Sequence, residues 1–203
     1  MGESEQPFTL HKDPLCSHSA HFRAAFEGNF KEAFEQSIRL PDVDLEGFRC
    51  YIHWAYSGEV VVLDPEQATE DQQGSRQRLG LINLYIIGDR LSDTLLRNTV
   101  INKIIAITRF TKRGFRTETI RLVYAELLPS SKLSKFIADP YVGHGSAAWL
   151  SDKRSALPKE FFEDLTIAMK SYQSMEGGLC ALDEKGDCTY HDHDFDVPEC
   201  GAT

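Results

Sequence analysis

The chain has 203 residues, 41% of them hydrophobic and 26% charged, which is typical of a globular protein with room for one domain and an appendage. The formal net charge is −9, and residues 183–199 carry −6 of it, because they contain seven acidic residues and one basic residue, Lys185. Nucleic-acid binding is excluded because no basic stripe could neutralise phosphates, and no apolar run reaches the roughly 18 residues of a membrane span. The acidic residues 1–7 are unlike a secretory signal, so we expect an intracellular protein with reduced cysteines.

Three short segments in the first half of the sequence have the pattern of strands. Residues 8–11 and 38–40 alternate apolar and polar side chains, and residues 60–63 are a run of β-forming residues. Residues 64–75 are polar and are expected to form a loop.

Helices are predicted between these strands and after them. Apolar stripes at helical spacing predict helices that end at Gly28, run from the Asp44 cap to Gly58, span 79–88, and follow the Asp93 cap. This mixture of elements excludes a regular βαβ repeat and predicts an α+β fold, in which a small sheet is covered by a helical cluster.

The second half of the sequence predicts a helical extension. Thr117 and Ser131 are positioned to cap two helices, and Pro158 is positioned at the start of a third. Residues 139–154 contain proline and two glycines and are expected to form a loop. Each helix has an apolar stripe that needs cover, so we expect the extension to lean on the first module and the polar chain after Gly177 to be loose.

Several short motifs follow one another over about a hundred residues in an order typical of one family. They include Phe8-Thr9-Leu10-His11-Lys12, Leu40-Pro41-Asp42-Val43, Trp54-Ala55-Tyr56-Ser57-Gly58 and the run Leu84-Tyr85 to Gly88-Asp89. Together they resemble the BTB/POZ family, and the residues after Arg109 resemble the tail of its fungal-type members. The resemblance implies a protein-interaction module, and not an enzyme, with its first strand missing from the sequence. We therefore predict a BTB/POZ domain at 7–109, a helical extension at 110–175 and an acidic Cys/His-rich tail at 176–203.

A candidate binding motif follows the first long helix of this module. The resemblance implies that Phe30-Lys31-Glu32 matches the hydrophobic-x-Glu motif of BTB adaptors of cullin ubiquitin ligases, with Tyr56 adding contacts. An aromatic anchor with a nearby carboxylate suits such a role. The competing interpretation of the same residues is a loop with one buried Phe and one solvated Glu. The alternative is a stand-alone oligomerisation or scaffold domain in transcriptional or other regulation. In either case the partners are proteins, a cullin scaffold or a second copy.

A candidate metal site lies in the tail. Two thiolates and two imidazoles can bind Zn²⁺ tetrahedrally, and the sequence offers Cys188, His191, His193 and Cys200, with Cys180 as a substitute ligand. The spacing differs from that of standard zinc fingers, and chance clustering in an acidic tail is the competing explanation. No P-loop, dinucleotide fingerprint or metalloprotease helix occurs, so no catalytic site is predicted.

Overall fold

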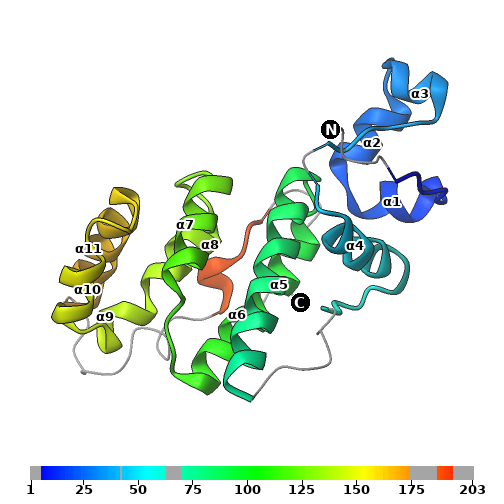
Figure 1. Ribbon diagram of the computed structural model, residues 1–203. Coiled ribbons are helices and arrows are strands. Elements are labelled where there is room, and N and C mark those ends of the chain that lie inside the picture. The colour runs from blue at the N-terminus through cyan, green and yellow to red at the C-terminus, as the bar shows by residue number, and fades with distance from the viewer. Residues whose placement is uncertain (1–5, 42, 63–69, 174–186, 194–203) are drawn as a thin grey trace, which may run out of the picture.

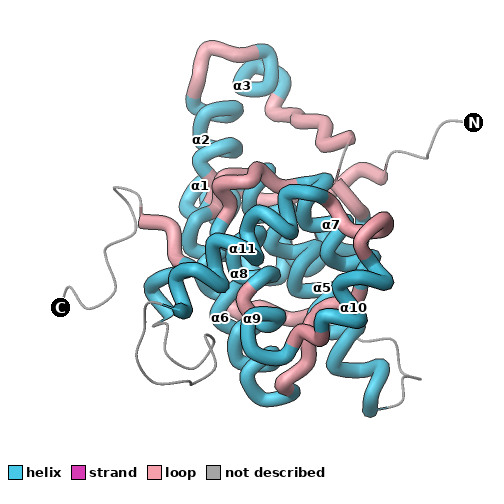
Figure 2. Tube along the Cα trace, turned by 90° about the vertical axis from the view of Figure 1, so that its left-hand side faces the viewer, coloured by secondary structure: helices cyan, strands magenta, loops and turns pink. Residues whose placement is uncertain are grey.

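The part of the chain that the structure describes is helical. The computed structural model describes residues 6–41, 43–62, 70–173 and 187–193, and within these ranges it contains no strand (Figures 1 and 2). None of these helices is both long and apolar enough to cross a membrane. The helices are α1 (Lys12–His18), α2 (Ala20–Glu27), α3 (Lys31–Glu35), α4 (Leu45–Ser57), α5 (Glu70–Arg90), α6 (Thr94–Thr111), α7 (Thr117–Glu126), α8 (Lys132–Ala138), α9 (Pro140–His144), α10 (Ala147–Lys153), α11 (Lys159–Gln173) and the 3₁₀ helix η1 (Asp187–Tyr190).

The predicted α+β fold with a small sheet is wrong. Residues 8–11, 38–40 and 60–62 form no ladder with one another in the described ranges, and they lie instead against helices. The Phe8 ring, for example, meets the Phe48 ring of α4 edge-on with the centroids 5.4 Å apart. Alternation of apolar and polar side chains shows only that one side of a segment is covered. Whether a sheet or a helix provides the cover depends on distant residues.

Two of the predicted loops are partly helical. Residues 70–75 belong to the first turns of α5, and residues 139–154 contain α9 and α10. Pro140 occupies the first turn of α9, where a missing N–H costs nothing, and Ser146 accepts a hydrogen bond from the Trp149 N–H at 3.1 Å to cap α10. Proline and glycine therefore marked the ends of short helices here rather than a continuous loop.

The predicted helix ends near Gly28, Asp44, Gly58 and Asp93 are confirmed. Asp44 accepts from the Gly47 N–H and Asp93 from the Leu96 N–H, both at 2.8 Å. Gly58 ends α4 with a φ of 70°, a left-handed conformation that glycine adopts without steric cost. Ser19 caps α2, because its side chain accepts a hydrogen bond from the Phe22 N–H at 3.1 Å. These signals act within four residues and so can be read from sequence.

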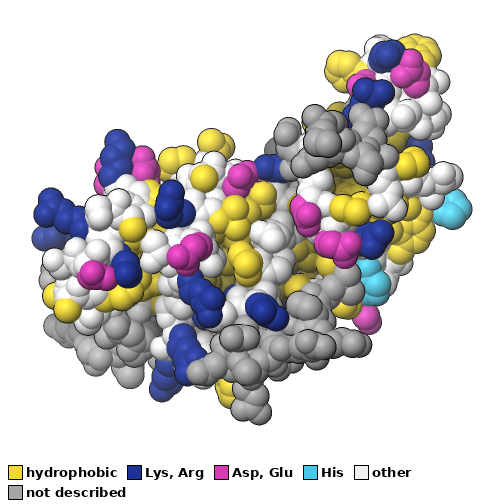
Figure 3. Space-filling view, in the orientation of Figure 1, with side chains coloured by type: hydrophobic (Ala, Val, Ile, Leu, Met, Phe, Trp, Pro, Cys, Tyr) yellow, Lys and Arg dark blue, Asp and Glu magenta, His cyan; other side chains and the backbone are white. Residues whose placement is uncertain are grey.

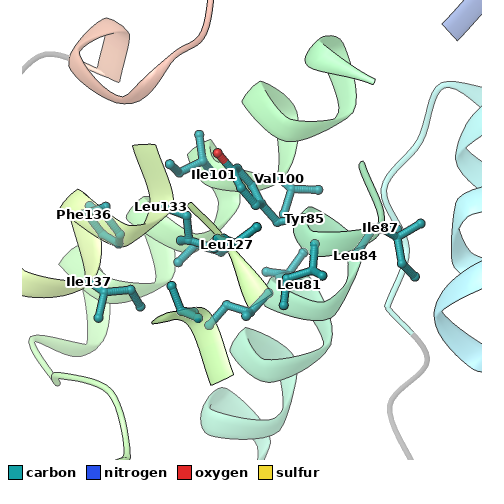
Figure 4. Close-up of a cluster of buried hydrophobic side chains, with 14 of the residues drawn as sticks. Leu81, Leu84, Tyr85, Ile87, Val100, Ile101, Leu127, Leu133, Phe136 and Ile137 are labelled. Atoms are coloured by element: carbon teal, nitrogen blue, oxygen red, sulfur yellow. The ribbon is translucent and has the colours of Figure 1, made fainter. Parts of the chain in front are cut away.

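The antiparallel pair α5–α6 is the centre of the molecule. Helix α4 packs on one side of this pair, while α7 and α8 lie on the other (Figure 1). The apolar side chains between them form one continuous core, part of which is drawn in Figure 4. Its labelled members are Leu81, Leu84, Tyr85, Ile87, Val100, Ile101, Leu127, Leu133, Phe136 and Ile137. Both halves of the chain thus bury their apolar surface on the same two helices.

Candidate interaction arm and C-terminal cluster

Helices α2 and α3 project from the body as an arm, and α3 is at its far end (Figures 1 and 2). Helix α3 packs against α2, and the turn between them is tight at Gly28. A Cβ atom at Gly28 would lie 2.5 Å from the Ala24 carbonyl oxygen and 2.8 Å from the Phe30 ring. Only glycine permits this approach without a shift of the backbone. The Gly28 turn therefore fixes where Phe30 stands on the arm.

The arm exposes two aromatic side chains. Phe30 is 59% exposed and Phe34 is 82% exposed, while Glu32 between them is partly buried. In Figure 3 the end of the arm shows hydrophobic atoms beside both basic and acidic side chains. The prediction from sequence included Phe30 and Glu32 but missed Phe34. The signal for it was a large aromatic residue in a short segment, 31–36, whose other residues are charged or polar apart from Ala33 and so form no apolar stripe.

Tyr56 stands apart from the arm, on α4. Its hydroxyl accepts a hydrogen bond from the His11 backbone N–H at 2.8 Å and lies 3.1 Å from His11 Nδ1. Its side chain is half-exposed, and within the described residues no hydrogen bond or ring contact joins it to Phe30 or Glu32. In this structure Tyr56 holds the N-terminal segment against α4. The three predicted partner-binding residues therefore do not form one cluster.

Residues 187–193 are docked on the body, so the prediction of a loose chain after Gly177 is wrong for this segment (orange in Figure 1). The Asn98 side chain pairs with the Asp192 backbone, donating from Nδ2 to the carbonyl at 2.8 Å and accepting from the N–H at 3.0 Å. The Tyr190 ring packs edge-on against Phe136 at 5.1 Å, and Arg97 forms an ion pair with Asp192 at 2.9 Å. Contacts to both α6 and α8 thus hold a polar segment in a fixed position.

The Tyr190 hydroxyl adds a buried polar contact to this docking. It donates a hydrogen bond to the Asp139 carboxylate, at the end of α8. Burial, together with that carboxylate, raises the pKa of Tyr190, so the hydroxyl stays protonated and remains a donor at neutral pH.

Docking brings three of the predicted metal ligands together. Ligand-capable atoms of Cys188, His191 and His193 all lie within 4.8 Å of one another. Cys188 Sγ is 3.1 Å from His193 Nε2, and His191 is buried. The other two predicted ligands, Cys180 and Cys200, lie outside the described residues. Asn98 and Asn102, the two asparagines of α6 that contact this segment, were not predicted from the sequence. The available signal was a pair of polar residues one turn apart on an apolar helix, which indicates a polar contact on that face.

Residues 1–76 match the family model described as "BTB/POZ domain". The match identifies residues 1–76, rather than the whole chain, as a BTB/POZ domain. The mouse protein "TD and POZ domain-containing protein 3" is 26% identical over 172 residues, which are 81% of this chain and 42% of that protein. Human "Kelch-like protein 26" is 39% identical over 59 residues, 29% of this chain and 10% of that protein. The chain thus spans about two fifths of the length of its mouse relative. No solved structure matches the chain.

The BTB/POZ domain contains α1 to α4, and so it includes the whole arm. Domains of this family are protein-interaction modules, which agrees with an exposed aromatic pair on a projecting element. The similarity to the mouse protein covers more residues than the domain itself, so part of the helical extension shares it. The predicted domain end at 109, the fungal type and the missing first strand stay predictions.

Proposed function

We propose that this chain is an adaptor that binds a cullin-type scaffold of ubiquitin ligases through the α3 arm. The observation that carries the proposal is Phe30, which is 59% exposed on a projecting element with Glu32 two residues later. The BTB/POZ domain and the similarity to Kelch-like protein 26 support this kind of partner. The surface of the body, including the helical extension, would then be available to bind a second protein.

The physical case rests on how protein interfaces obtain their affinity. A few large side chains near the centre of an interface, aromatic ones above all, supply most of the binding energy when they are withdrawn from water. Phe30 and Phe34 expose apolar surface that a partner could withdraw from water, and both belong to the same short helical segment. A carboxylate at Glu32 adds orientation, since a charged group at the rim selects among partners more than it adds affinity.

Phe30→Ala is expected to weaken binding to a purified cullin N-terminal domain at least about 30-fold, the effect of losing one interface anchor of about 2 kcal/mol. Because the Phe30 ring is mostly exposed in the unbound chain, its removal should change the thermal unfolding of the protein little. Glu32→Lys should weaken binding further by reversing the charge at the rim. Isothermal titration calorimetry of the full chain against the cullin domain measures these effects.

Phe110→Ala is the matched control, because Phe110 is 90% exposed but lies on α6 in the body. The same truncation at that position should leave the affinity unchanged. Equal losses from Phe30→Ala and Phe110→Ala would show non-specific hydrophobic binding. Undiminished binding by the Phe30→Ala, Glu32→Lys double variant would reject the adaptor role of the arm.

A second candidate function is self-association as a scaffold domain. It is favoured by the segments 8–11, 38–40 and 60–62, which have no backbone ladder within the described residues and could pair with the same segments of another copy. Light scattering across a wide concentration range tests this function. A dimer whose mass is unaffected by Phe30→Ala, in a chain that does not bind the cullin domain, would support the scaffold role over the adaptor role.

A further inference from the structure

The segment that carries Cys188, His191 and His193 has a defined position on α6. Its anchors are Asn98 and Asn102, which are four residues apart and therefore lie on one face of the helix. Asn98 fixes the backbone of Asp192, the residue between the two histidines. Because Asp192 lies between the two histidines, its pairing with Asn98 also restricts the positions of the flanking imidazoles, whose ring centroids are 6.1 Å apart.

The Asn102 side chain orients one of these imidazoles. His191 Nε2 lies 2.7 Å from Asn102 Oδ1. An amide oxygen can only accept, so Nε2 carries the proton and Nδ1 keeps its lone pair. Metal-bound histidines commonly donate their second ring N–H to such an oxygen, which fixes both the tautomer and the ring orientation. His191 is therefore prepared to bind a cation through Nδ1.

The distances within the cluster suit a small tetrahedral ion. Bond lengths of about 2.0–2.3 Å place two donors of a tetrahedral Zn²⁺ site roughly 3.3 to 3.7 Å apart. Cys188 Sγ and His193 Nε2 are 3.1 Å apart, and one ring nitrogen of His191 lies within 4.8 Å of a ligand atom of each of the other two residues. Side-chain movements of this size would complete the arrangement. Sulfur and imidazole donors select zinc over calcium and magnesium, which prefer oxygen.

We propose that Cys188, His191 and His193 bind one Zn²⁺, which fixes the conformation of the segment 187–193 where it lies on α6. The three side chains fill three of the four positions of a tetrahedral ion, with the cysteine bound as thiolate. Asn102 is a positioning residue that holds His191 in the binding tautomer. The role of the ion is structural: it joins three side chains of the segment 187–193, which the hydrogen bond between His191 and Asn102 links to α6. This proposal is independent of the cullin partner.

The test is the zinc content and zinc affinity of the whole 203-residue chain. Mass spectrometry of the dialysed protein should find about one zinc per chain, and competition with a chromophoric chelator should give its affinity. Cys188→Ser and His193→Gln are each expected to weaken binding at least about 100-fold, and Asn102→Leu about 10- to 100-fold, the range for a lost orienting contact. Cys50→Ser, which removes a thiol from α4, is the matched control and should retain the zinc.

Two further measurements separate metal binding from loss of fold. The Co²⁺-substituted protein should show a thiolate-to-cobalt charge-transfer band that Cys188→Ser abolishes and Cys50→Ser keeps. In the wild type, removal of the metal by chelation should accelerate amide exchange in 187–193, leave α5 protected, and be reversed by added zinc. Less than about a tenth of an equivalent of zinc, an unchanged affinity in Cys188→Ser, or an equal loss in Cys50→Ser would overturn the proposal.

Discussion

Asp93→Ala is expected to lower the free energy of unfolding by about 3 kcal/mol. The Asp93 side chain is fully buried and makes two contacts at once: one oxygen caps α6 through the Leu96 N–H at 2.8 Å, and the other accepts from the Trp54 indole N–H at 3.0 Å. Loss of the cap costs about 1 kcal/mol and an orphaned buried indole N–H about 1–3 kcal/mol. Urea denaturation of wild type and variant measures the change.

Asp93→Asn is the conservative partner of this variant. The asparagine retains one oxygen, so it can keep the cap or the Trp54 bond but not both, and the expected loss at neutral pH is about 1 kcal/mol. Burial raises the pKa of the Asp93 carboxyl above its ordinary value, so its contribution is fully present below the unfolded pKa and is lost as pH rises through the folded pKa. The advantage of wild type over Asp93→Asn should therefore shrink from acidic to neutral pH. Equal stabilities of Asp93→Ala and wild type would contradict the bridging role.

Tyr141→Phe is also expected to lower the free energy of unfolding by about 3 kcal/mol. The Tyr141 hydroxyl accepts from the Phe115 backbone N–H at 2.8 Å and donates to the Phe115 carbonyl at 2.5 Å, which ties the chain after α6 to α9. Without the hydroxyl, both backbone groups are left buried and unpaired, at about 1–3 kcal/mol each. The control is Tyr56→Phe, in which a half-exposed hydroxyl loses one bond to His11, and which should cost less than about 1 kcal/mol.

The wild type and Tyr141→Phe should also differ in how their stability changes at alkaline pH. Burial raises the pKa of Tyr141 from 10.0 to about 12, so the stabilisation is complete below pH 10 and disappears as pH rises to about 12. Over this window wild type should lose about 2 kcal/mol more than Tyr141→Phe, whose phenyl ring does not titrate. Parallel curves for the two proteins in urea titrations between pH 9 and 12 would show that this hydroxyl stays hydrated in the folded state.

The position of the candidate sites could be predicted only in part. The motif at Phe30 and Glu32 was visible in sequence, but Phe34, the more exposed aromatic residue, was not identified. The candidate metal ligands Cys188, His191 and His193 were named from residue type and spacing. Their convergence depends on Asn98 and Asn102, which are not themselves candidate ligands. No sequence pattern links these asparagines to Cys188, which follows them by 86 to 90 residues.

The sequence by itself determined the helix ends at Asp44, Gly58 and Asp93 and the apolar stripes of the longer helices. The caps at Ser19, Asp44 and Asp93 and the stop at Gly58 involve residues within four positions of each other, so local chemistry is sufficient to specify them. The tertiary structure decided what covers each apolar side: residues 8–11 lie against α4 and not in a sheet, and residues 187–193 lie on α6. Those outcomes depend on contacts such as Asn98 with Asp192, 94 residues apart, and such contacts form only when the whole core packs.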